Sequence, residues 1–91
     1  MVSRCGTSCT LPNISELLPD STLAAIADEL AAARAEHAPI HSGHEAIGVL
    51  LEEWIEVREE AFRKVVDRAR LRKELIQLAA MCARTVEDLS L

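Results

Sequence analysis

Aromatic residues are almost absent from this chain of 91 residues, which has one Trp, one Phe and no Tyr. Its apolar residues are instead Leu, Ala, Ile and Val, which suit the packing of helix against helix. Glycine and proline are also scarce, and Gly48 is the only residue of either type between Glu45 and Leu91. Long stretches without these helix-breaking residues predict an all-α fold with long helices.

The sequence also lacks an apolar run of the roughly 18 residues that a membrane-spanning helix needs. No apolar stretch typical of a secretion signal follows the first residues, so we expect a cytoplasmic protein without a membrane partner. The three cysteines are an odd number, and Cys5 and Cys9 have no second pair, which leaves little support for a zinc site. We expect reduced thiols instead.

Basic residues are in deficit, because ten Lys and Arg against fifteen Asp and Glu give a formal net charge of -5. An acidic chain repels the phosphates of nucleic acids, so we expect no nucleic acid as a partner. Acidity does suit a cation and, through the cation, a phosphorylated small molecule. A chain this short buries only a little over half of its unfolded surface, so association of copies is the simplest way to add core.

Caps and apolar periodicity divide the chain into a loose N-terminal segment, residues 1–19, and a single helical domain, residues 20–91. Asn13 can open one short helical turn within the loose segment. The first long helix is expected over about residues 22–37. It ends before Pro39, where a helix cannot easily continue.

Two further helices follow. Ser42 and, three residues later, Glu45 form a capping box that starts the second helix near Gly43. Asp67 can cap the third helix, which we expect over about residues 68–89 after a tight turn.

Both of these helices carry an apolar stripe at helical spacing. Arg58 interrupts the stripe of the second helix, either as a side chain whose stem covers apolar surface or as an ion pair at an interface. The stripe of the second helix contains Ile47, Leu50, Leu51, Trp54, Ile55, Ala61, Phe62 and Val65, and that of the third contains Leu71, Leu75, Leu78, Cys82, Val86 and Leu89.

The side of the second helix opposite Trp54 is acidic. Successive residues turn by about 100° around an α-helix, so Glu52 and Glu56 stack on one face, with Glu45 and Glu59 on the same side. Like charges at this spacing destabilise a helix by a few tenths of a kcal/mol each, unless a positive group lies against them. A hard divalent cation such as Mg²⁺ is the natural candidate, and a solvated acidic face is the alternative.

The third helix has a polar stripe of its own, opposite its apolar positions. If the two polar stripes face each other across a bundle, Glu74 joins Glu52 and Glu56 around one cavity, and basic residues can meet phosphates. Each helix then needs partners on both sides, which favours an oligomer with the site near a helix–helix interface. The polar stripe of the third helix contains Arg70, Lys73, Glu74, Gln77, Arg84 and Asp88.

Glu52-Glu53-x-x-Glu56 and, after seventeen intervening residues, Glu74-x-x-Gln77 resemble the EExxE…ExxD signature of the MazG-like all-α NTP pyrophosphatases. The resemblance extends over nearly all of the expected helical domain. It implies an antiparallel helical bundle completed by oligomerisation, as a homodimer or homotetramer. It also implies hydrolysis of a nucleoside triphosphate, NTP or dNTP, to a monophosphate and pyrophosphate with Mg²⁺ or Mn²⁺ as cofactor.

The resemblance assigns roles to the matching positions. Glu53 and Glu56 become the catalytic carboxylates, one of which acts as general base for the attacking water. The implied metal ligands are Glu52, Glu56, Glu74 and Gln77. The candidate substrate contacts come from charge and position instead: Arg70, Lys73 and Arg84 on the polar stripe of the third helix, and His44 beside the acidic face of the second.

Gln77 stands where the family has its final Asp. An amide oxygen can coordinate a hard cation but carries no charge, so metal affinity should fall. Three outcomes are open: activity with fewer metals, substitution by another carboxylate such as Asp88 or Glu45, or a non-catalytic relative. A helical oligomerisation or regulatory module, or a nucleotide sensor of the same fold, is therefore the alternative to a pyrophosphohydrolase.

Overall fold

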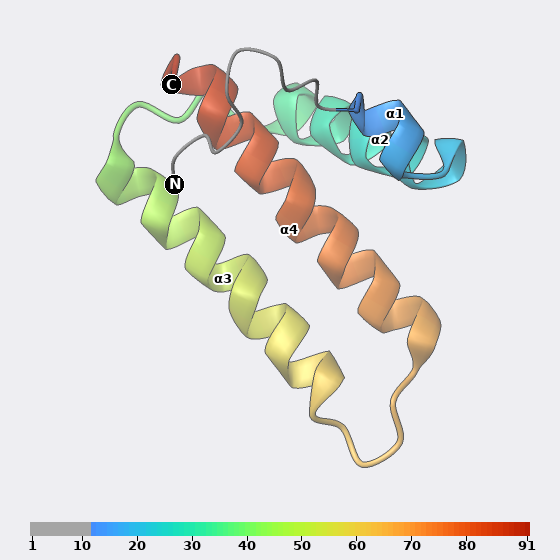
Figure 1. The fold of residues 1–91 in the computed structure, drawn as a ribbon. Coiled ribbons are helices and arrows are strands. Elements are labelled where there is room, and N and C mark those ends of the chain that lie inside the picture. The colour runs from blue at the N-terminus through green and yellow to red at the C-terminus, as the bar shows by residue number, and fades with distance from the viewer. Residues whose placement is uncertain (1–11) are drawn as a thin grey trace, which may run out of the picture.

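A computed structural model describes residues 12–91, and the expectation of a loose segment falls largely on residues 1–11, outside this range. The described chain is all-helical, as the sequence predicts. α3 and α4 form an antiparallel hairpin, and α2 packs against α4, so that α4 is common to both interfaces (Figure 1). The elements in chain order are α1 (Ile14–Leu17), α2 (Asp20–Glu36), α3 (Gly43–Ala61) and α4 (Arg68–Asp88).

Local side-chain caps start the two long helices of the hairpin, as predicted. Ser42 Oγ accepts a hydrogen bond from the Glu45 backbone N–H at 3.1 Å. Asp67 Oδ1 accepts from the backbone N–H groups of Ala69 and Arg70 at 3.0 and 3.2 Å. Each cap satisfies donors that the first turn of a helix leaves without partners.

The packed core is small. Within residues 12–91, α3 buries Ala46 and Val57, whereas its predicted apolar stripe faces away from α4. Ile47, Leu51, Trp54 and Ile55 of that stripe are between 42% and 66% exposed, while Leu50 is half-buried. The buried apolar residues are Ile40, Ala46, Val57, Ile76, Ala80 and Met81, against twelve large apolar residues that are exposed.

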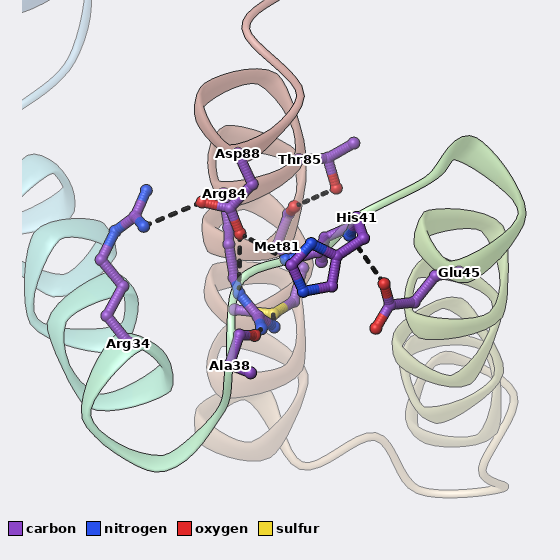
Figure 2. A network of polar contacts seen from close by, with 9 residues as sticks. Arg34, Ala38, His41, Glu45, Met81, Arg84, Thr85 and Asp88 are labelled. Carbon is purple, nitrogen blue, oxygen red and sulfur yellow. Dashed lines mark hydrogen bonds and ion pairs between the residues drawn. The ribbon is translucent and has the colours of Figure 1, made fainter.

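The loop between α2 and α3 is fixed against the end of α4. Ile40 in this loop is 1% exposed, and its backbone N–H donates to Asp88 Oδ2 at 2.9 Å. The Arg84 guanidinium donates to the Ala38 carbonyl at 2.6 Å and lies 3.5 Å from the Asp88 carboxylate. Arg34 of α2 completes this network with a 2.9 Å ion pair to Asp88 (Figure 2). Three segments thereby meet at the last turns of α4.

Among residues 12–91, no helix combines the length and the apolar character needed to cross a membrane.

Candidate metal site

Three glutamates converge where α3 faces α4. Glu53 and Glu56 lie one turn apart on α3, and Glu74 approaches from α4. Each offers one carboxylate oxygen, and these three oxygens all lie within 4.8 Å of one another. One hard cation could therefore take an oxygen from each of the three residues.

Two oxygens of this cluster lack a hydrogen-bond donor. Glu53 Oε2 and Glu74 Oε1 are shielded from solvent and accept no hydrogen bond from the described protein. A buried polar atom left in this state destabilises a fold by about 1–3 kcal/mol. A cation bound between the carboxylates would satisfy both oxygens at once.

The pKa shifts of the cluster also favour a bound cation. Burial raises the pKa of Glu53, and the negative charges of Glu56 and Glu74 raise this pKa further. Burial also raises the pKa of Glu74, and the negative charge of Glu56 raises it further, while the positive charge of Lys73 lowers it. The carboxylates thus repel one another, and a bound positive ion would offset that repulsion.

Two cavities open beside Glu53. One of about 330 Å³ lies between α2, α3 and α4, and its lining includes Glu29 and Gln77. The other, of about 320 Å³, lies under the α2–α3 loop, and its lining includes Glu52 and Arg84. Both volumes fall in the range of small-molecule sites, and Glu53 lines both cavities.

A larger hollow of about 600 Å³ lies elsewhere, where the start of α4 faces Thr22 of α2. Its walls include Leu71, Leu75 and Ile76 and contain no acidic residue. This hollow therefore has none of the carboxylate chemistry found around Glu53.

The sequence-predicted glutamates are only partly brought together. Glu56 and Glu74 come together, as the sequence predicts. The third carboxylate of the cluster is that of Glu53 and not the predicted Glu52. Glu52 is exposed and lines the cavity under the α2–α3 loop. The two neighbours point in directions about 100° apart around α3, and α4 packs on the side that holds Glu53. Gln77 lies in the cavity on the α2 side of Glu53.

The predicted phosphate contacts are dispersed. Arg84 is 5% exposed and is already engaged by Asp88 and Ala38, so it supports the fold. Lys73 lines a hollow between α2 and α4, and Arg70 and His44 are exposed. Asp88, the possible substitute ligand, is engaged by Arg34, Arg84 and the backbone N–H of Ile40.

One residue beside the cluster was missed at the level of sequence. Glu29 of α2 lines the same cavity as Glu53, and its charge contributes to the raised pKa of Glu53. Glu29 and Glu36 are seven residues apart, which places both on one face of α2. That spacing is the signal that could have revealed an acidic face on α2 in addition to that of α3.

Comparison of the chain with protein-family models, with curated proteins and with solved structures finds no match.

Proposed function

We propose that this protein is a metal-dependent nucleoside triphosphate pyrophosphohydrolase, which converts an NTP or dNTP to a monophosphate and pyrophosphate. The observation that carries the proposal is the meeting of Glu53, Glu56 and Glu74 with two shielded oxygens that lack donors. The motif resemblance to the MazG-like pyrophosphatases supports it. Mg²⁺ or Mn²⁺ is the expected cofactor, because these hard cations bind carboxylate oxygens and keep coordination positions for water and phosphate.

The solvent exposure of the three carboxylates suggests which would bind the metal and which would act as general base. Glu53 and Glu74, both half-buried, would hold the cation, while Glu56 is exposed and has direct access to water. Glu56 is therefore the better-placed general base of the two catalytic candidates, Glu53 and Glu56. When bound, the metal supplies charge against the phosphate oxygens and lowers the pKa of the attacking water.

The metal would be the main partner of the substrate phosphates. Arg84 is committed to Asp88, and the cavity that contains Gln77 has no Lys or Arg in its lining. A triphosphate is repelled by uncompensated carboxylates, so productive binding requires the cation. This predicts that nucleotide and metal bind together rather than separately.

Self-association belongs to the proposal. The large apolar residues exposed on α3 and α4 favour a homodimer or homotetramer that completes a helical bundle. We expect this assembly in the cytoplasm, and we expect no nucleic-acid partner because the chain carries a net charge of -5.

A nucleotide screen by thermal shift, with and without Mn²⁺, followed by a pyrophosphate assay, tests the function. Glu56→Ala and Glu74→Ala should each lower pyrophosphate release by about 100-fold or more. Glu59→Ala is the matched control, since Glu59 is an exposed glutamate of α3 outside the cluster.

The outcomes separate the alternatives. No pyrophosphate from a full panel of NTPs and dNTPs would rule out the hydrolase. Stabilisation by nucleotide and metal without turnover would identify a nucleotide sensor. No stabilisation by either would leave a helical oligomerisation or regulatory module.

A further inference from the structure

The turn between α3 and α4 and the start of α4 carry most of the positive charge of the protein. Of the ten Lys and Arg residues of the chain, six lie between residues 63 and 73, where Asp67 is the single acidic residue. The rest of the chain contains four basic and fourteen acidic residues. This region forms the tip of the hairpin, at the opposite end of α4 from Asp88 (Figure 1). The six basic residues are Arg63, Lys64, Arg68, Arg70, Arg72 and Lys73.

Most of this charge is not neutralised inside the protein. Arg63 is the exception, because its guanidinium donates to both carboxylate oxygens of Glu60 at 2.9 and 3.1 Å. Asp67 uses its Oδ1 to accept from the first backbone N–H groups of α4. The other five basic side chains are exposed and form no ion pair within residues 12–91. They are therefore free to meet an external anion.

The first turns of α4 are electrostatically unfavourable in the isolated protein. α4 begins at Arg68, with Arg70 and Arg72 close behind, and its first turn contains no acidic residue. The amino end of a helix carries a partial positive charge, so cations there oppose the helix dipole, whereas external anions are favoured. A layer of phosphate groups against the tip would offset this repulsion.

Apolar side chains project from the same tip. Phe62 and Val65 are 81% and 83% exposed, and Val66 is 41% exposed. Val66 also lines the apolar hollow of about 600 Å³ between α2 and the start of α4, so apolar surface continues from the tip toward α2. Exposed apolar side chains surrounded by Lys and Arg are the combination that binds the interface of a membrane.

We propose that the hairpin tip, defined as residues 62–73, binds the surface of an anionic phospholipid membrane. Lys64, Arg68 and Arg72 meet the phosphates of the headgroups, while Phe62 and Val65 enter the edge of the apolar layer. The sequence predicts no membrane partner because it contains no spanning helix, but a contact at the membrane surface requires none. The inference goes beyond the proposed function and does not depend on it.

The apolar residues of the tip favour a lipid surface over a nucleic acid. Basic residues alone would suit either polyanion. Aliphatic side chains such as Val65 gain little from a sugar–phosphate backbone, whereas a membrane removes them from water. The acidic remainder of the chain also opposes contact along a nucleic acid, while a membrane surface can meet the tip alone.

Flotation of the full chain with lipid vesicles tests the inference. Vesicles of phosphatidylcholine mixed with phosphatidylglycerol should carry the protein, and vesicles of phosphatidylcholine alone should not. Binding to the anionic vesicles should fall as salt is added, because salt screens exposed charges.

Removal of positive charge from the tip should weaken binding. Arg72→Gln should lower the affinity for anionic vesicles by about fivefold, and the double variant with Arg68→Gln by about 30-fold, because each basic residue near an anionic membrane contributes about the same factor. Ala35→Glu is the control, since it lowers the net charge by as much as Arg72→Gln does. Ala35 is exposed on the turn of α2 that Arg34 ties to Asp88, far from the tip, so this variant should bind like the wild type.

Removal of apolar surface from the tip distinguishes membrane insertion from charge attraction. Phe62→Ser should lower the affinity by about tenfold or more, because the variant buries less apolar surface in the membrane. Leu91→Ser is the control at the other end of α4, where Leu91 is also 81% exposed, and it should bind like the wild type. Circular dichroism checks that each variant keeps its helices. If Phe62→Ser fails to fold, Val65→Ser replaces it.

Undiminished binding by the double arginine variant or by the apolar variant overturns the inference, as does equal binding to the two kinds of vesicle. A wild-type chain that floats with neither kind also overturns it. If that chain then binds duplex DNA at the same salt concentration, the basic tip is a nucleic-acid surface instead.

Discussion

The Asp88 carboxylate accepts a hydrogen bond from the Ile40 backbone N–H at 2.9 Å, across 48 positions of the chain (Figure 2). The same carboxylate pairs with Arg34 of α2 and with Arg84 of its own helix. One side chain at the end of α4 thereby ties α2 and the α2–α3 loop to the hairpin. That loop forms a wall of the cavity beside Glu53, so Asp88 supports the proposed site from a distance.

Asp88→Asn should weaken the fold at neutral pH by an amount that shrinks in acid. The hydrogen bond from Ile40, followed by that from Arg34, holds the pKa of Asp88 below its ordinary value of 3.8. The Asp88 carboxyl therefore binds a proton more readily in the unfolded chain than in the folded one. The stability that ionised Asp88 contributes is complete above the pKa of the unfolded chain, and it is lost as pH falls through the pKa of the folded chain. Urea unfolding from neutral to strongly acid pH measures the difference in free energy of unfolding between the wild type and Asp88→Asn. A difference that does not change with pH would contradict the prediction.

Ile40→Ala should lower the free energy of unfolding by about 2–5 kcal/mol, because the side chain is almost completely buried and its removal leaves a cavity. Ile14→Ala is the matched control, since Ile14 is 60% exposed on α1. Urea denaturation at neutral pH compares the two variants. Equal losses would show that Ile40 does not anchor the loop.

Ser42→Ala should cost about 1 kcal/mol of stability, because the first turn of α3 loses the acceptor for the Glu45 N–H. Asn13→Ala is the matched control for Ser42→Ala. Asn13 occupies the same position at the start of α1, but its side chain makes no capping hydrogen bond. Its removal should leave the unfolding midpoint in urea unchanged, and a loss as large as that of Ser42→Ala would argue against the capping explanation.

The contrast between these two caps illustrates what sequence could predict. Helix ends depend on a few neighbouring residues, so Ser42 and Asp67 are recognisable from sequence. The bounds expected for the first and third long helices, and the start expected for the second, lie within two residues of those observed. Phe62 and Val65, which the sequence places on the stripe of the second helix, lie beyond its observed end at Ala61. The side that each helix buries depends instead on partners far away in the chain. Periodicity finds an apolar and a polar side of α3 but does not say which side meets α4.

Two site residues show the consequence. Whether Glu52 or Glu53 meets Glu74 is decided by the rotation of α3 about its own axis, which the packing of α4 sets. The positive charge of Arg84 predicts a phosphate contact, yet Asp88 four residues later holds its guanidinium in an ion pair. The i, i+4 spacing was visible in sequence, but the burial that makes the pair structural was not.

Gln77→Asp should tighten Mn²⁺ binding by about tenfold, because the number of charged ligands tunes the affinity of such sites for hard cations. Gln77 lines the cavity beside Glu53 and lies three residues after Glu74 on α4, so an added carboxylate would be next to the cluster. Gln77→Leu is the control, which removes the amide without adding charge and should weaken binding. Isothermal titration with Mn²⁺ gives the affinities, and equal values for wild type and Gln77→Asp would place residue 77 outside the site.

Glu53→Gln should have opposite effects on stability without and with metal. With a chelator present, the raised pKa of Glu53 means that its charged form is disfavoured in the folded state. The stability contributed by protonated Glu53 is complete below its ordinary pKa of 4.5. It is lost as pH rises through the raised pKa of Glu53 in the folded chain. At neutral pH the neutral amide should therefore stabilise the metal-free fold, by about 1 kcal/mol or less because solvent screens a partly exposed group.

Mn²⁺ should reverse that order. The wild type gains stability by binding the cation, whereas the variant loses one of three carboxylates and gains little. Thermal unfolding in chelator and in excess Mn²⁺ measures both effects, with Glu59→Gln as an exposed α3 control that should follow the wild type in each condition. If Mn²⁺ raised the melting temperature of Glu53→Gln as much as that of the wild type, the cation would bind elsewhere, and the carboxylate cluster would be an acidic feature of the helix packing.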